Sequence, residues 1–462
     1  MRRERRWLYG GLAALALVLL AARAAAAVYV DYRWYASLGA ASLWWLKAQN
    51  VVLLKGASLL AGGAFVFVNL YAVRQSVASV VLPRRVGDLE IGEELSPRYL
   101  LTAVALGSLA LAALLTLPAD RWVALAAARR GVPFGIAVRA DALENDAAFA
   151  AAATREAAML VPEGAAKWWV LRPAEGVYDF ADLDRIFAFA ARHGQAVRGH
   201  TLVWHAAMED WTVAALAEGP ARGRALLEEY FDRVLGYTAP AIRDWDVANE
   251  AVADPWKSNE LLKDSPWLRS IGPDYLDLAF RLARRRDPGL TLTYNDYGCE
   301  HDTDFDDEKR RRVLALVRGM RDRGVPIDAV GLQGHMHRDN KFSAPKLAGF
   351  VRSVRALGLR VLVTELDVIE PETQSDPAER DAKSAALVHA FVSTVLEAGG
   401  DAVLCWGLSD RHSWASDEPP LAPAENTPGT PGSARPLPLD RDLRRKPMWH
   451  ALARAFEGRP WP

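Results

Sequence analysis

The stretch Ile242–Glu250, IRDWDVANE, begins as an apolar, β-prone run and ends abruptly in an amide and a carboxylate. Its aliphatic and aromatic residues favour a buried strand. Asn249 and Glu250 do not suit such a position, because a polar group buried without a partner is costly. We therefore expect this strand to end where a wall of the fold opens toward solvent or a ligand.

Seven further short apolar runs occur after Gly131, and longer amphipathic stretches alternate with them. The runs are FGIAV from Phe134, AAMLV from Ala157, AVRGHTLVW from Ala196, LTLTYND from Leu290, IDAVGLQGH from Ile327, RVLVTELD from Arg360 and DAVLCWGLSD from Asp401. This alternation is typical of βα units. Eight units predict an α/β fold, a (β/α)8 TIM barrel, over residues 131–462. A doubly wound sheet is the alternative, but FGIAVRADAL lacks the Gly-rich phosphate turn that usually follows the first strand of such a sheet.

Most of these runs end in polar or aromatic residues, as in GHTLVWH, VANE, YNDYG, LQGHMH, TELD and WGLSD. The carboxyl ends of barrel strands are where TIM-barrel enzymes keep their catalytic groups. Glu250 and Glu365 end the fourth and seventh runs, so we expect both in one barrel mouth. A lone strand-end Glu is most often part of a salt bridge. A pair that flanks a scissile bond is instead what glycoside hydrolysis requires.

The motifs GHTLVWH, WDVANEAV, YNDYG, VGLQGHMH, VTELDV and WGLSDRHSW, in this order and spacing, resemble glycoside hydrolase family 10, the retaining endo-β-1,4-xylanases. The resemblance covers the chain from about Phe134 to its end. It implies an endo-acting hydrolase that cleaves internal β-1,4 linkages of xylan by double displacement. It implies no cofactor and no metal. A β-glycan hydrolase or transglycosylase of different sugar specificity is the nearest alternative.

The resemblance also implies roles for individual residues. Glu250 matches the acid/base, Glu365 the nucleophile, and Asn249 the amide that binds the sugar 2-hydroxyl. We expect repulsion between the two carboxyl groups to leave Glu365 ionised and Glu250 protonated near neutral pH. His335 and Asp367 match residues that support the nucleophile. Further matches to substrate-binding residues are His200, Trp204, His205, Lys167, Glu163, Gln333, Trp406 and Trp414, the last two as indoles over the glycone side.

Four features depart from the family pattern. The residues after His205, AAMEDW, differ from the usual pattern. Gly164 stands where the family usually has Asn, and Gly334 replaces a small polar residue. The stretch Ala415–Asp440, after the eighth run, is long and rich in Pro. These differences leave the two catalytic assignments unchanged and bear on substrate preference.

The amino-terminal part predicts membrane insertion. A basic head is followed by an apolar stretch within residues 1–30, and Gly56–Val73 and Tyr99–Leu117 contain no charged residue. Each is long enough to span a bilayer, so residues 1–119 are expected to form about three transmembrane helices, with a linker at 120–130. Buried soluble helices, or a cleaved signal peptide for the first stretch, are the alternatives.

The distribution of arginines predicts which side of the membrane the barrel faces. Four arginines precede the first span and four lie between the second and third, so both regions should be cytoplasmic. The catalytic domain would then lie on the periplasmic or extracellular side. The stretches DYRWYASLGAASLWWLKAQ and RRVGDLEIGEELSPRYLL also resemble the membrane part of an uncharacterised multi-span bacterial family.

Composition limits the partners. Lys and Arg number 56 against 57 Asp and Glu, so charge does not favour nucleic acid. The expected partners are a β-1,4-xylan or related β-glycan and the lipid bilayer. Two readings compete with the hydrolase. One is a metal-dependent barrel hydrolase that uses His335, His337, His200 and His205. The other is a membrane-tethered, non-catalytic glycan-binding module.

Overall fold

The computed structural model describes residues 122–461, except 207, 240, 371–375 and 417–433, together with two short strands near residue 87. Contacts divide the chain into two units, Met1–Ala119 and Asp120–Pro462. The two short strands, β1 (Arg85–Val86) and β2 (Leu89–Glu90), pair antiparallel in the first unit.

The three predicted membrane spans lie outside the described residues. Within the described part of the chain, no helix is both long and apolar enough to cross a bilayer.

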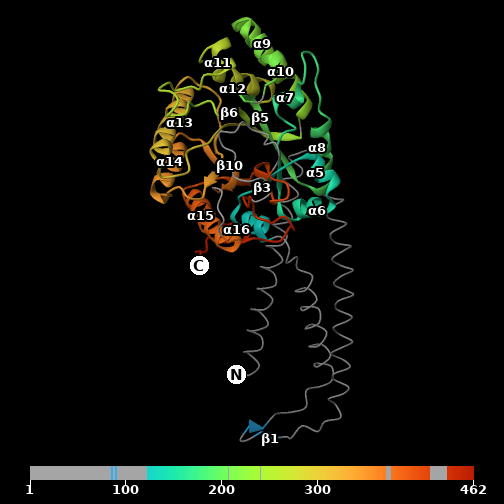
Figure 1. Cartoon of the computed structure of the whole chain (residues 1–462), viewed down its shortest axis with the longest axis vertical. Coiled ribbons are helices and arrows are strands. Elements are labelled where there is room, and N and C mark those ends of the chain that lie inside the picture. The colour runs from blue at the N-terminus through green and yellow to red at the C-terminus, as the bar shows by residue number, and fades with distance from the viewer. Residues whose placement is uncertain are drawn as a thin grey trace, which may run out of the picture. The chain divides into compact units, whose positions relative to one another are not determined.

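Eight parallel strands form a closed barrel in the second unit (Figure 1). They are β3 (Phe134–Val138), β4 (Met159–Pro162), β5 (Ala196–Trp204), β6 (Ile242–Asn249), β7 (Thr291–Asp296), β8 (Ala329–Leu332), β10 (Arg360–Ile369) and β11 (Ala402–Cys405). They follow one another around the ring in chain order, and β11 pairs with both β10 and β3. A short strand, β9 (His335–His337), extends the pairing of β10 beyond β8. Each strand overlaps one of the eight predicted runs, so the barrel prediction is confirmed.

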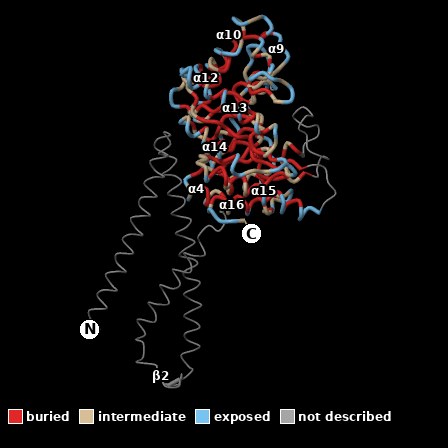
Figure 2. The backbone as a smooth tube through the Cα atoms, turned by 90° about the vertical axis from the view of Figure 1, so that its left-hand side faces the viewer, coloured by how far each residue is buried: buried red, intermediate tan, exposed pale blue. Residues whose placement is uncertain are grey.

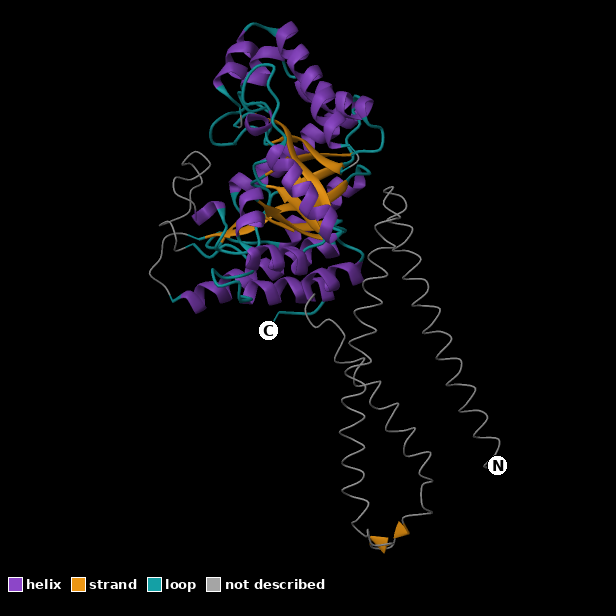
Figure 3. Cartoon of the chain, turned by 90° about the vertical axis from the view of Figure 1, so that its right-hand side faces the viewer, coloured by secondary structure: helices purple, strands orange, loops and turns teal. Residues whose placement is uncertain are grey.

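Helices surround the strands (Figure 3). They are α4 (Trp122–Arg130), α5 (Ala140–Asn145), α6 (Ala147–Glu156), α7 (Trp168–Leu171), α8 (Ala181–His193), α9 (Asp210–Ala217), α10 (Pro220–Thr238), α11 (Pro266–Ile271), α12 (Tyr275–Arg286), α13 (Asp304–Asp322), α14 (Ala344–Ala356), α15 (Pro377–Glu397) and α16 (Pro447–Glu457). Local chemistry sets their ends. The Thr303 hydroxyl caps the start of α13, and α8 ends at Gly194 in the left-handed conformation.

The core lies between the strands and the inner faces of the helices, where the buried residues concentrate (Figure 2). One close contact fixes the spacing of β5 and β6: a Cβ atom on Gly199 would lie 2.2 Å from the Trp245 ring. The fully buried Trp245 indole therefore requires a glycine opposite it.

Several strands that carry polar groups also show breaks in register. The pairing of β5 with β6 shifts between His200 and Val203, and that of β10 with β11 shifts between Val363 and Leu366. Such irregularities re-aim side chains near a barrel rim. They allow the polar ends of β5 and β10 to point into the mouth.

Candidate active site

Glu250 follows directly after β6 and has a left-handed backbone, with φ of 56°. This conformation is uncommon for a non-glycine residue, and such residues concentrate at functional sites. The Glu250 N–H donates to the Asn295 carbonyl at 2.9 Å, which holds the turn in place. Its carboxylate accepts hydrogen bonds from Trp204 Nε1 and Gln333 Nε2, each at 2.9 Å. Side chains from β5 and from the end of β8 thus orient this carboxylate in the mouth.

Glu365 lies within β10 and is almost fully buried, with 4% of its surface exposed. Asn295 Nδ2 donates to its Oε1 at 2.6 Å. His335 Nε2 lies 3.3 Å from Oε2, and His200 Nδ1 lies 3.8 Å from Oε1. A buried carboxylate with these donors is held in one orientation.

Three amides, those of Asn295, Asn249 and Gln333, link the two glutamates. Asn295 Nδ2 donates to Asn249 Oδ1 at 3.0 Å as well as to Glu365, and Gln333 Nε2 lies 3.2 Å from the same Asn249 oxygen. Thr364 Oγ1 donates to Asn295 Oδ1 at 2.6 Å, which fixes which end of that amide faces the glutamate. Because the Asn249 oxygen accepts these bonds, its Nδ2 is the group left to donate to a ligand.

The His335 imidazole connects the buried Glu365 to a second carboxylate. Its Nδ1 lies 2.8 Å from Asp367 Oδ1, and Trp414 Nε1 donates to Asp367 Oδ2 at 2.7 Å. Burial alone would lower the pKa of His335, but Asp367 and Glu365 outweigh it and raise that pKa well above its ordinary value. His335 is therefore a partly buried imidazolium that donates toward both carboxylates.

The His200 ring is held in place by the buried ion pair of Arg198 and Asp246. Its Nδ1 lies 2.9 Å from Asp246 Oδ2, and Arg198 donates to both Asp246 oxygens at 2.6 Å. Burial would raise the pKa of Asp246, but Arg198 and His200 together lower it. The His200 ring in turn meets the Trp406 indole edge-on, with centroids 5.0 Å apart. This bidentate pair fixes the ring that faces Glu365.

Lys167 occupies the part of the mouth between β5 and β11. Its Nζ lies 4.8 Å from the Trp204 ring centroid and 5.7 Å from that of Trp406. Burial lowers the pKa of Lys167, although Glu365, Glu163 and Glu250 act in the opposite direction. Glu163 follows β4 and is 7% exposed. Cations, carboxylates and flat indoles together suit a sugar, whose hydroxyls need polar partners and whose ring faces need apolar ones.

On the other side of Glu250 lies a hollow lined by Trp204, His205, Glu250 and Lys263, among others. Burial by itself would raise the pKa of Glu250, but Lys263, Gln333, His205 and Trp204 outweigh it, so the pKa is lowered. This direction is opposite to the one expected from repulsion between the two glutamates. The physical reason is the cation Lys263, which the sequence motifs did not place beside the acid. Burial and Lys263 likewise lower the pKa of His205 to about 4, so His205 is neutral near pH 7.

The structure thus places all thirteen predicted site residues in the middle or carboxyl-terminal part of the barrel strands or in the loops that follow them. Five further residues shape the site and were not predicted: Asn295, Thr364, Arg198, Asp246 and Lys263. Asn295 had a detectable signal, because it lies in the strand-end motif YNDYG. Thr364 and Asp246 lie in the motifs VTELDV and WDVANEAV, whereas nothing in the spacing distinguishes Arg198 or Lys263.

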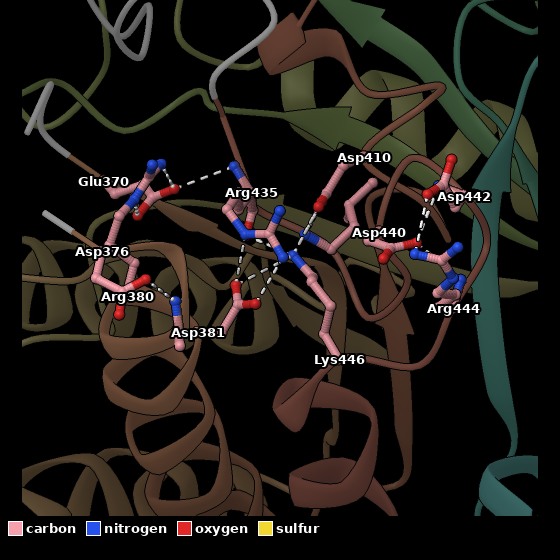
Figure 4. Close-up of polar contacts among 12 residues, drawn as sticks. Glu370, Asp376, Arg380, Asp381, Asp410, Arg435, Asp440, Asp442, Arg444 and Lys446 are labelled. Atoms are coloured by element: carbon pink, nitrogen blue, oxygen red, sulfur yellow. Dashed lines mark hydrogen bonds and ion pairs between the residues drawn. The ribbon is translucent and has the colours of Figure 1, made fainter. Parts of the chain in front are cut away.

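The last part of the Pro-rich stretch Ala415–Asp440 is anchored beside β10. Residues 417–433 of this loop lie outside the described residues. After them, Arg435 binds Asp381 with two hydrogen bonds of 2.8 and 2.6 Å, and its N–H donates to Glu370 (Figure 4). The Val368 N–H donates to the Pro436 carbonyl at 3.1 Å. These contacts secure the chain one residue away from the Asp367 carboxylate.

Two of the histidines considered as metal ligands, His200 and His335, have carboxylate partners. The His200 Nδ1 lies 2.9 Å from Asp246 Oδ2, and both His335 nitrogens face carboxylates. Within the described ranges, no three His, Cys, Asp or Glu side chains gather as a ligand set.

Two family models match the chain. The model of glycosyl hydrolase family 10 matches residues 123–455. The model of an uncharacterised protein family (UPF0182) matches residues 8–153.

Curated relatives and solved structures agree with the first of these matches. An endo-1,4-β-xylanase from Humicola insolens is 31% identical over 324 residues, which cover 69% of this chain and 70% of the relative. A β-1,4-xylanase from Dictyoglomus thermophilum is 34% identical over 265 residues, which cover 55% of this chain and 72% of the relative. The structure of xylanase 10B from Thermotoga petrophila in complex with xylobiose has a TM-score of 0.64 at 25% identity and covers 73% of this chain and 97% of its own. The chain therefore belongs to glycosyl hydrolase family 10.

Proposed function

We infer that the barrel is a retaining endo-1,4-β-xylanase. The observation that carries this conclusion is the pair of glutamates, Glu250 and Glu365, joined in one mouth through the amides of Gln333, Asn249 and Asn295. One glutamate is buried beside an imidazolium, and the other is orientated by an indole and an amide at the edge of a hollow. These two environments suit a nucleophile and an acid/base. The family match and the xylanase relatives support xylan as the substrate.

In the first step, Glu365 attacks the anomeric carbon and forms a glycosyl ester. Glu250 gives its proton to the glycosidic oxygen as that bond breaks, so the leaving sugar departs as a neutral alcohol. The His335 imidazolium holds Glu365 in place. The Asn249 Nδ2 donates to the 2-hydroxyl, a contact that strengthens in the transition state.

In the second step, Glu250 is a carboxylate and removes a proton from water. The water oxygen attacks the anomeric carbon, the ester bond breaks, and Glu365 leaves as a carboxylate. Two inversions at the same carbon give net retention. The lowered pKa of Glu250 favours this step, because the residue is readily deprotonated in the site.

The test is hydrolysis of xylan and of a panel of other β-glycans by the purified protein, followed by proton NMR of the newly formed ends. We expect internal cleavage of β-1,4-xylan, with the β-anomer appearing first. First appearance of the α-anomer would overturn the two-step mechanism. Faster cleavage of a different β-glycan would overturn the substrate assignment alone.

For the amino-terminal region we propose membrane anchoring through residues 1–119, with the barrel on the periplasmic or extracellular side. Three uncharged or nearly uncharged apolar stretches and the placement of arginines support this. Extraction of membranes with alkaline carbonate should leave the protein in the pellet. External protease applied to spheroplasts should cleave the barrel. Release by carbonate would contradict the anchoring.

A further inference from the structure

A hairpin after β6 lies across the mouth from the strand that carries the two glycone-side indoles. In the ring of eight strands, β6 is four positions from β11 in either direction. Trp406 and Trp414 follow β11, whereas the chain after β6 continues from Glu250 into residues 251–263. Glu250 is proposed to protonate the leaving sugar. The hairpin at residues 251–263 therefore borders the leaving-group side of the cleft.

This hairpin is rigidly built. Val252 and Leu262 form an antiparallel bridge, and the Lys263 N–H donates to the Ala251 carbonyl at 2.8 Å. Two buried cations of α13 bind its backbone from beneath. Lys309 Nζ donates to the Val252 carbonyl at 2.9 Å, and Arg312 Nη1 donates to the carbonyls of Ala253, Ser258 and Glu260 at 3.3, 2.7 and 3.0 Å. Such a loop presents its side chains in a fixed position.

The hairpin presents one large apolar side chain to solvent. Trp256 is 80% exposed, the highest value among the large apolar side chains of the described residues. Its ring meets Phe305 in a T-shaped contact with centroids 5.1 Å apart. Phe305 in turn rests on Gly298, where an added Cβ would lie 2.4 Å from the Phe305 ring. Trp256 is thus held at its position while most of its surface remains in water.

The base of the same hairpin belongs to the catalytic mouth. Lys263 lines the hollow beside Glu250 and donates to the Tyr297 hydroxyl at 3.3 Å. The Tyr297 hydroxyl donates to Asp254 Oδ1 at 2.6 Å, two residues before Trp256. The segment from Glu250 to Trp256 is therefore continuous and is held in place by hydrogen bonds.

We propose that Trp256 is a stacking platform for a xylose residue of the leaving-group part of the chain, beyond the sugar that contacts Lys263. The proposal rests on the xylanase function inferred above. Xylopyranose carries no hydroxymethyl group, so its flat apolar faces suit an exposed indole. A polymer reaches this position, whereas a substrate with a small aryl leaving group does not. Trp256 would therefore favour long chains and set where they are cut.

The experiment compares Trp256→Ala with the unaltered full-length protein on xylan, on xylo-oligosaccharides of increasing length and on an aryl β-xylobioside. We expect kcat/KM for the long substrates to fall roughly two- to tenfold, with the aryl xylobioside unchanged. Trp256→Phe should restore most of the loss. End-labelled xylohexaose should be cut at shifted positions by Trp256→Ala.

The matched control is Tyr237→Ala, which removes an exposed aromatic ring from α10 near the amino end of β6, at the opposite end of the barrel. It should leave all these values unchanged. An equal loss on the aryl xylobioside, or no change on any substrate, would overturn the platform. If the unaltered protein cleaves xylan, either result leaves the proposed function intact. If the unaltered protein does not cleave xylan, the proposed xylanase function is overturned, whatever the result for Trp256→Ala.

Discussion

At the residue scale, the two glutamates differ in what their removal should leave behind. Glu365→Ala removes the nucleophile, so turnover of every substrate should fall on the order of 10⁴-fold or more. Glu250→Ala removes the proton donor, so turnover of xylan should fall by about 10²- to 10⁴-fold. An activated aryl group leaves without a proton, so the first step on aryl xylobioside should be largely spared. Pre-steady-state release of the phenol measures this step, and an equal loss on both substrates would argue against Glu250 as the acid.

Lys263 should control the pH range of activity. The first step needs protonated Glu250, so the alkaline limb of kcat/KM follows the pKa of Glu250, which Lys263 lowers. Lys263→Met removes the cation and raises that pKa. Glu250 then stays protonated to higher pH, and the alkaline limb should move upward. Lys263→Arg, which keeps the charge, is the control and should hold the limb near its original position. A limb that does not move in Lys263→Met would show that another group sets it.

Gly164 offers a gain of function. An added Cβ at this position meets no atom within 4 Å, so a side chain fits. Gly164→Asn restores the amide usual in the family beside Glu163 and Lys167. One new hydrogen bond contributes about 0.5–1.5 kcal/mol, which corresponds to a two- to tenfold lower KM for xylo-oligosaccharides. Gly164→Ala separates the effect of the amide from that of backbone stiffening. An unchanged KM in Gly164→Asn would mean that other groups already bind this hydroxyl.

At the element scale, Glu300 links the loop after β7 to the junction of β8 and β9. Its carboxylate accepts from the N–H groups of Cys299 and Gly334 at 2.6 and 2.9 Å. Burial and the nearby Asp306 raise the pKa of Glu300 to about 7 from an ordinary value of 4.5. The folded state therefore binds this proton more tightly than the unfolded state does. The resulting stabilisation is complete below about pH 4.5 and is lost as the pH rises through about 7.

Glu300→Gln should remove this dependence. The free energy of unfolding of the unaltered protein, relative to the variant, should decrease between pH 4.5 and 8. Urea denaturation at several pH values measures the difference. Parallel curves for the two proteins would show that Glu300 does not titrate in this range. Glu300 also bears on the active site, because it accepts a hydrogen bond from Gly334. Gly334 lies between Gln333, which contacts Glu250, and His335, which contacts Glu365.

The position of each residue along its strand, and the strands that it contacts, explain which site residues could be predicted. Glu250, Glu365 and His335 lie in recognisable motifs at the ends of the predicted runs, so their position in the mouth follows from the barrel alone. Asn295 and Thr364 act through a side-chain hydrogen bond between β7 and β10, two strands that are not neighbours in the sheet. Such a contact depends on the tilt of the strands across the barrel, which periodicity does not specify.

At the scale of the whole molecule, the sequence by itself determined the eight-strand barrel, because each βα unit carries its own local pattern of apolar periodicity and turn residues. It also determined which two carboxylates meet in the mouth, since parallel strands place their carboxyl ends on one side. The tertiary structure alone decided the electrostatics of the acid. Glu250 comes close to Lys263 only when the hairpin folds back against α13, and this contact reverses the expected direction of its pKa shift. Long-range charge placement of this kind depends on how loops pack, and no local pattern in the chain encodes it.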